Sequence, residues 1–195
     1  MDISKTKVCV CGIQRSGKTE FTKYLINQLK RPSWYLVHLD DLDRMPRNVE
    51  VILAEEKNMT ELNLISKIII EKGKKGESDG LVIDEADMFL KNHNNAIPKY
   101  INDLVINHRH YGLSVVFVTR RPQDIPAKII ESCEHLFIFA MPNSTNIERK
   151  LNAIDKNLIL MLPFLSIEKH NFIYKRLGQK PKLFHPTFEQ TYTLK

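Results

Sequence analysis

The stretch Gly12-Ile13-Gln14-Arg15-Ser16-Gly17-Lys18-Thr19 decides the fold expected of this chain, because it matches the pattern of a phosphate-binding loop. Four residues separate its two glycines, which let the backbone turn so tightly that successive N–H groups point at phosphate oxygens. We expect Lys18 to neutralise γ-phosphate charge and Thr19 to bind Mg²⁺ through its hydroxyl. The residues expected around the nucleotide are Gly12, Gln14, Arg15, Ser16, Gly17, Lys18, Thr19 and Glu20.

The sequence on both sides of this loop has the periodicity that the motif requires. Residues 7–11 form a short apolar run typical of a buried parallel strand. Apolar residues then recur at helical spacing, at Phe21, Tyr24, Leu25, Ile26 and Leu29. A glycine turn that matched by chance would lack these flanks, so the sequence predicts a strand, a nucleotide loop and a helix in succession.

A second motif is an apolar strand, residues 81–83, that runs directly into Asp84 and Glu85. A strand end beside the phosphate loop places Asp84 where it can hold Mg²⁺ through water, and Glu85 where it can polarise an attacking water. A base aimed at water has no use in a small-molecule kinase. The pair of acids therefore predicts ATP hydrolysis.

Other strand ends add candidate residues. Thr119 and Arg120 follow the expected strand 113–119, where a polar side chain can contact the γ-phosphate or the attacking water. Asp40 follows the expected strand 34–39 and either contacts Mg²⁺-bound water or belongs to a solvated acidic turn. The remaining elements expected are strands at 49–53 and 135–140, helices at 62–73, 97–108, 125–133 and 155–162, and polar loops at 72–80 and 91–99. A further helix is expected to begin at 142–144 and to bury Ile147, Leu151 and Ile154.

Composition bounds the class of protein. The chain has 195 residues, enough for one domain, and its 29 Lys and Arg against 23 Asp and Glu give a net charge of +6, which favours polyanionic partners. Cys9 and Cys11 lie two apart on one strand, so they are expected to be small buried hydrophobes. Without an apolar leader or a long apolar run, the chain is expected to be cytoplasmic.

The C-terminal part changes character. Residues 172–176 read as a strand, 177–181 as a turn and 183–184 as the return strand. We therefore expect a small β-hairpin appendage, about residues 166–195, on a single domain that spans 1–195.

With these residues placed, the chain resembles the HerA/FtsK superfamily of P-loop ATPases, in particular the compact, poxvirus-type genome-packaging ATPases of double-stranded DNA viruses with internal membranes. The most specific stretch is 110–126, HYGLSVVFVTRRPQDIP, which looks like the family's helix end, sensor strand and Arg-Pro turn. The resemblance implies an α/β fold of the RecA-like (ASCE) class. This is a three-layer sandwich whose five core strands, numbered along the chain, have the order 5-1-4-3-2.

The resemblance also implies an assembly and partners. These are a hexameric or pentameric ring, ATP and Mg²⁺, duplex DNA gripped by its phosphates in a central pore, a capsid or viral membrane protein, and a place in the host cytoplasm or the virion. The loops 72–80 and 91–99 are the candidates for DNA contact. An arginine finger would come from the neighbouring subunit, with Arg109 favoured over Arg120 and Arg121. The family usually has Gln where this chain has Arg120, so either Thr119 or Arg120 takes the sensor role.

Other classes of ATPase fit the sequence less well. A DEAD-type helicase needs two tandem domains, and an AAA+ loader needs a separate helical lid where this chain has about 55 residues ending in a hairpin. A nucleotide kinase would have an Arg-rich lid, and Glu85 argues against it. A nucleotide-gated binding module without turnover would not need the intact set Lys18, Thr19, Asp84 and Glu85.

Overall fold

The computed structural model describes residues 3–27, 34–37, 49–56, 58–91, 96–142 and 144–185 of the chain. For residues 34–37 it describes the backbone alone. Asp40 and part of the predicted loop 91–99 lie outside these residues.

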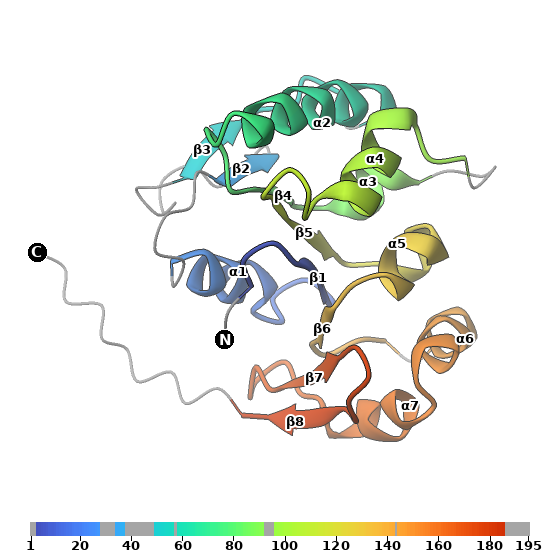
Figure 1. The fold of residues 1–195 in the computed structure, drawn as a ribbon. Coiled ribbons are helices and arrows are strands. Elements are labelled where there is room, and N and C mark those ends of the chain that lie inside the picture. Colours follow the sequence, from blue (N-terminus) through green and yellow to red (C-terminus); the bar gives the residue numbers. More distant parts are fainter. Residues whose placement is uncertain are drawn as a thin grey trace, which may run out of the picture.

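A single twisted sheet forms the centre of the molecule (Figure 1). Its strand order is β3-β2-β4-β5-β1-β6-β7-β8, with parallel pairing from β3 through β6 and antiparallel pairing of the last two strands. The strands are β1 (Lys7–Cys11), β2 (Trp34–Val37), β3 (Val49–Ile52), β4 (Gly80–Ile83), β5 (Ser114–Thr119), β6 (His135–Ile138), β7 (Phe172–Arg176) and β8 (Lys182–Phe184).

The predicted order of the five core strands is confirmed, since β6, β1, β5, β4 and β2 are neighbours in that sequence. The sheet is wider than this core. β3 adds a parallel strand at one edge, and the predicted hairpin, β7 and β8, continues the sheet at the other edge.

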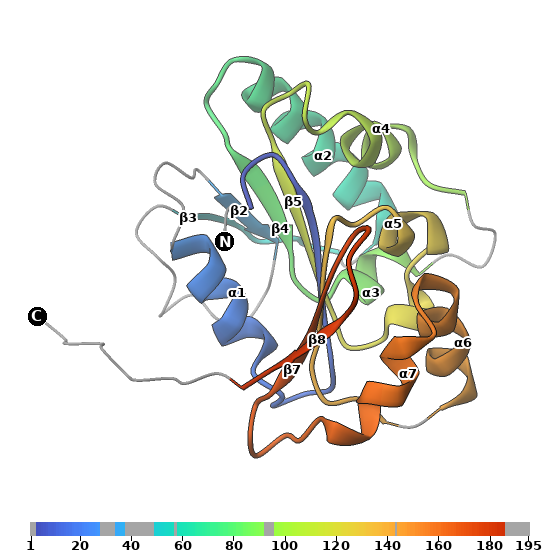
Figure 2. The same cartoon turned by 60° about the horizontal axis from the view of Figure 1, so that its bottom comes forward.

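Helices cover both faces of the sheet (Figure 2). Helix α1 lies on one face, and the other helices lie on the opposite face. The helices are α1 (Lys18–Asn27), α2 (Met59–Lys74), α3 (Ala86–Leu90), α4 (Lys99–Asn107), α5 (Ala127–Glu131), α6 (Thr145–Ile154) and α7 (Asn157–Met161), with 3₁₀ turns η2 (Pro122–Asp124) and η3 (Leu162–Phe164). Among the described residues, no helix combines the length and apolar character that crossing a membrane requires.

Alternating side chains along β1 divide the core in two, as expected for a strand buried on both faces. Val8 and Val10 pack in the α1-side core, whereas Cys9 and Cys11 pack in the core on the opposite face. Both cysteines are free and fully buried, which confirms their role as small hydrophobes. The three-layer α/β class predicted for the chain is therefore confirmed.

Several element boundaries differ from those expected. The loop predicted at 72–80 is shorter, because α2 continues through Lys74 and β4 begins at Gly80. The strand predicted at 135–140 ends at Ile138, and the Ala140 carbonyl instead accepts a hydrogen bond from Ile13 N at 2.9 Å. A contact with a distant residue thus bends this chain end toward the phosphate loop.

Candidate nucleotide-binding and catalytic site

The phosphate loop leaves the carboxyl end of β1 and is anchored to both neighbouring strands. Gly12 N donates to Thr119 O at 3.2 Å, and Ile13 N donates to Ala140 O at 2.9 Å. A Cβ atom at Gly12 would lie 2.7 Å from Phe139 Cβ and 2.8 Å from Ser16 Oγ. Only glycine fits this position, so the first glycine of the motif is required by packing as well as by the turn.

Two other residues of the loop, Arg15 and Gly17, have a left-handed backbone conformation. Gly17 has φ of 98° and Arg15 has φ of 64°, a region that costs a residue with a side chain about 1–2 kcal/mol. The Arg15 and Gln14 side chains are exposed, whereas Ser16 is buried. Ser16 Oγ has no hydrogen-bond partner among the described residues, as expected of a loop whose polar groups serve a ligand.

Lys18 begins α1 and folds back over the loop. Its buried Nζ donates a hydrogen bond to Ile13 O at 2.7 Å. Burial lowers the pKa of Lys18, while the carboxylate of Asp84 acts in the opposite direction. Because an anionic ligand would stabilise the charged amine, the environment of Lys18 fits a phosphate.

The next two residues of the motif lie on the first turn of α1. Thr19 is half-buried, as a metal ligand at the edge of a site would be. The exposed Glu20 carboxylate forms an ion pair with the buried Lys23 at 3.2 Å. Any contribution of Glu20 to phosphate binding therefore falls on its backbone rather than on its side chain.

The two acids of the second motif follow β4. Asp84 is buried, and its Oδ1 accepts a hydrogen bond from Glu85 N at 2.8 Å. Glu85 has φ of 50°, a strained conformation that turns the chain from β4 into α3. Glu85 Oε1 accepts a hydrogen bond from Arg120 Nη2 at 2.8 Å, so the predicted base and the arginine at the tip of β5 are in direct contact.

A buried carboxylate that sequence reasoning missed fixes the tip of β5. Thr119 Oγ1 donates to Asp87 Oδ1 at 2.7 Å, and Arg120 N donates to the same oxygen at 3.2 Å. Thr119 Oγ1 also accepts from Arg121 N at 3.0 Å. The signal that would have found Asp87 is its spacing, three residues after Asp84 on the first turn of α3.

The two sensor candidates, Thr119 and Arg120, differ in exposure and in their hydrogen bonds. Thr119 is 1% exposed and already bonded, whereas the Arg120 side chain is 39% exposed and reaches the predicted base. The Thr119 hydroxyl is therefore committed to Asp87, whereas the Arg120 guanidinium contacts the Glu85 carboxylate.

Arg109 lies away from this site, near the amino-terminal ends of the parallel strands, whereas the site lies at their carboxyl ends. It follows α4, and its Nη2 lies 3.5 Å from Glu134 Oε1. The other oxygen of Glu134 accepts from Lys7 N at 2.9 Å, at the start of β1, whereas the phosphate loop follows the end of β1. Arg109 is 63% exposed and cannot join the site of its own chain. Arg121 is exposed as well, 3.8 Å from Asp124.

The residues that the structure brings together fit ATP with Mg²⁺. The charges of Asp84, Arg120 and Asp87 all act on Lys18, so the acids, the arginine and the lysine share one neighbourhood. Such a site has backbone donors and an amine for phosphates, and hydroxyl and carboxylate oxygens for a hard cation. It also has a carboxylate that can accept a proton from water.

Comparisons with known proteins agree with this fold. A family model described as zonular occludens toxin (Zot) matches residues 8–147, which is most of the chain. No curated protein sequence matches the chain significantly.

Three solved structures are similar to the chain at low sequence identity. The DNA-packaging ATPase B204 from Sulfolobus turreted icosahedral virus has a TM-score of 0.82 and 19% identity, over 95% of this chain and 99% of that protein. The genome-packaging NTPase B204 from Sulfolobus turreted icosahedral virus 2, in complex with ATP-gammaS, has a TM-score of 0.81 and 19% identity, over 93% and 98%. The N-terminal domain of zonular occludens toxin from Neisseria meningitidis has a TM-score of 0.57 and 15% identity, over 92% and 93%. These structures share the fold of the chain.

Proposed function

The chain belongs to the zonular occludens toxin (Zot) family, and from its nucleotide site we propose that it is an ATPase that moves double-stranded DNA, the genome-packaging motor of a DNA virus. We also propose that the chain is related to the poxvirus-type packaging ATPases of the HerA/FtsK superfamily. One observation carries the enzymatic part. Glu85 sits at a strand end beside Asp84 and makes a 2.8 Å contact with Arg120, whose charge, like that of Asp84, acts on Lys18.

ATP binds along the phosphate loop in this proposal. The backbone N–H groups of residues 12–19 and the Lys18 amine hold the β- and γ-phosphates. The Thr19 hydroxyl and the Asp84 carboxylate would hold Mg²⁺, which would supply positive charge to offset the charge of the phosphates.

Glu85 accepts the proton of the attacking water. Its left-handed backbone and the Arg120 guanidinium hold the carboxylate in one orientation, and such positioning is what a general base requires. When the γ-phosphate leaves, Arg120 can shift with it. Since Arg120 N and Thr119 Oγ1 both bond to Asp87, this shift is transmitted to the tip of β5.

A ring brings in the residues that one chain lacks. Arg109 is exposed at the edge opposite the phosphate loop, so it is available to the site of a neighbouring subunit. An arginine finger of this kind is worth about 10³–10⁵ in rate in related phosphoryl transfer.

DNA is the proposed substrate of the motor. A translocase must bind DNA of any sequence, so it holds the DNA by its phosphates, which agrees with the net charge of +6. Residues 72–80 and 91–99 are the proposed DNA-contacting segments. A capsid or viral membrane protein is the proposed partner, and the motor acts in the host cytoplasm or in the virion.

The structure of the C-terminal part disfavours the AAA+ alternative. In residues 144–185, α6 and α7 contribute Ile147, Leu151 and Leu158 to the main core, and β7 and β8 extend the sheet. This described part forms no separate helical lid. The kinase alternative has no use for a base aimed at water, which is the role proposed for Glu85.

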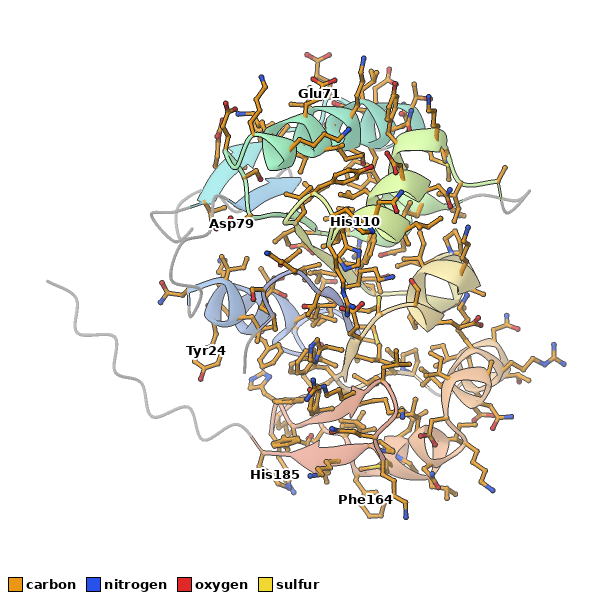
Figure 3. All side chains as sticks on the ribbon, in the orientation of Figure 1. Tyr24, Glu71, Asp79, His110, Phe164 and His185 are labelled. Atoms are coloured by element: carbon orange, nitrogen blue, oxygen red, sulfur yellow. The ribbon has the colours of Figure 1, made fainter. Side chains whose placement is uncertain are left out.

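The test of the proposal is ATP hydrolysis by the purified protein, with and without long duplex DNA, at low and high salt. We expect DNA to stimulate turnover at low salt, and the stimulation to fall steeply with salt because DNA binding releases counterions. Glu85→Gln should lower turnover by about 10²–10⁴-fold, the usual contribution of general base catalysis. Glu71→Gln is the matched control, because Glu71 lies exposed on the outer side of α2 (Figure 3).

The outcomes separate the two parts of the proposal. Turnover that is lost in Glu85→Gln but indifferent to DNA would leave an ATPase and reject the translocase. Turnover that appears only with a small phosphate acceptor would reject both.

A further inference from the structure

A turn far along the chain, residues 166–171, reaches the phosphate loop. A Cβ atom built on Gly17 would lie 3.3 Å from the Nδ1 atom of His170, and 3.7 Å from its Cβ and Cγ. The polar Nδ1 edge of this imidazole is thus its nearest part to the loop. Sequence reasoning missed His170, because 151 residues lie between it and Lys18 and it belongs to no motif.

The turn that carries His170 is rigidly built. Asn171 is buried, its Oδ1 accepts from Ser166 N at 2.7 Å, and its Nδ2 donates to Phe164 O at 2.7 Å. The next residue, Phe172, packs against Phe21 of α1 with ring centroids 4.9 Å apart. These contacts tie the turn to the helix that follows the phosphate loop, so the distance from His170 to Gly17 is fixed by packing.

The backbone of His170 is held in an unfavourable conformation. Its φ is 46°, in the left-handed region where a residue with a side chain costs about 1–2 kcal/mol. Asn or Gly would occupy this position with less strain. The strained backbone places an imidazole against the loop, although Asn or Gly would adopt this conformation at lower cost.

The Nδ1 atom of His170 is buried and has no hydrogen-bond partner among the described residues. A buried nitrogen left unpaired costs about 1–3 kcal/mol. Ser16 Oγ, in the phosphate loop itself, is also buried and has no hydrogen-bond partner among the described residues. Two orphaned polar atoms at one phosphate-binding loop indicate a ligand that satisfies them.

We propose that His170 is a nucleotide-contacting residue, whose Nδ1–H donates a hydrogen bond to a phosphate oxygen of the bound nucleotide. This inference rests on the proposed function, because it assumes that the loop binds a nucleotide. It makes the turn before β7 a wall of the nucleotide site. The C-terminal hairpin is then in direct contact with the ligand and is not a separate appendage.

The test compares substitutions at His170 that fit the left-handed backbone and differ in whether the side chain can donate a hydrogen bond to phosphate. His170→Asn keeps a donor where Nδ1 stands, His170→Gly removes it without strain, and His170→Asp replaces it with a charge that repels phosphate. Binding of a fluorescent methylanthraniloyl ATP, and its competition by inorganic tripolyphosphate, would be measured for each. Melting without nucleotide shows which variants are folded. His110→Asn is the matched control, because His110 is exposed (Figure 3).

We expect the Gly and Asp variants to bind ATP and tripolyphosphate about 10–100-fold more weakly, the effect of losing a hydrogen bond to a charged group. The Asn variant should stay within about threefold of the native protein, since it keeps the donor. If one of the weakened variants fails to fold, the other still carries the comparison with Asn.

Native affinity in the folded Gly or Asp variant would overturn the inference, and so would a loss confined to ATP with tripolyphosphate unaffected. Failure of the proposed function looks different. In that case the native protein binds no ATP, or Lys18→Ala binds it as tightly as the native protein does.

Discussion

The contact between Glu85 and Arg120 is the feature, at the scale of single residues, on which the proposed catalysis depends. Both side chains are partly exposed, so the pair contributes little to stability and serves to orient the carboxylate. We expect Arg120→Ala to lower kcat by about 10–100-fold with KM little changed, because a displaced base loses alignment with water. Steady-state hydrolysis measured over a range of ATP concentrations checks this.

Two further variants sharpen that measurement. Arg120→Gln should keep more activity than Arg120→Ala, since an amide can still donate to Glu85. Arg149→Ala, an exposed arginine on α6, should behave as the native protein. An Arg120→Ala enzyme with native kcat would show that Glu85 needs no orientation from this side chain.

The site residues divide by how they could be found. Lys18, Thr19, Asp84 and Glu85 follow from local spacing, because a phosphate loop and an acidic strand end are each encoded within a few residues. The spacing after Asp84 can suggest Asp87, but a single sequence does not show that Asp87 bonds to Thr119 or that His170 approaches Gly17, because both approaches arise only through the fold.

At the scale of elements, α2 depends on a glycine in its last turn, Gly73. A Cβ at Gly73 would lie 2.7 Å from the Leu113 side chain and 2.8 Å from Tyr111 O. Gly73→Ala should therefore destabilise the protein by about 1–3 kcal/mol through overpacking, although alanine favours helix. Urea unfolding measures the change.

Ile68→Ala on the same helix is the control, because Ile68 is 50% exposed. A surface substitution of this kind should change stability by about 0.5 kcal/mol or less. Equal or greater stability of Gly73→Ala would mean that α2 can move away from the turn before β5.

The end of α4 should make stability depend on pH. His108 is buried without a hydrogen bond to its ring among the described residues, and burial lowers its pKa, while Glu134 at 3.9 Å acts in the opposite direction. The unfolded chain takes up a proton near pH 6.5, and the folded protein does so only at lower pH. Stability should therefore fall as pH drops from about 6.5 through the lower, folded pKa.

Melting temperatures between pH 7.5 and 5 check this dependence. His108→Leu, which cannot titrate, should flatten the profile over that range, whereas His110→Asn should not. An unchanged slope in the leucine variant would assign the acid sensitivity to other groups.

The positions of the helices and strands were largely predictable from the sequence, whereas the residues at which they begin and end were less so. Apolar runs mark β1, β4 and β5 because these strands are buried on both faces. The early end of β6 and the extension of the sheet by β7 depend on contacts with Ile13 and with β6, which no local pattern contains.

At the scale of the whole molecule, the position of Arg109 predicts complementation between subunits. Glu85→Gln and Arg109→Ala should each be inactive alone if the arginine serves a neighbour's site. Mixed before ring assembly, they should recover part of the native activity, because some sites then combine an intact Glu85 with an intact Arg109. ATP hydrolysis of the mixture is the measurement.

A mixture of Glu85→Gln with Lys18→Ala is the control, since both substitutions damage the half of the site that one chain supplies. That mixture should stay inactive. If the first mixture is equally inactive, Arg109 has no role beyond its ion pair with Glu134.

The two margins of the sheet also bear on how the protein behaves at high concentration. Among the described strands, β3 and β8 have one open side each, and they span only four and three residues. Short margins, one of them carrying Lys182, give another chain little backbone on which to add a strand. Crowded copies of this protein are therefore protected against fibrous aggregation through strand addition.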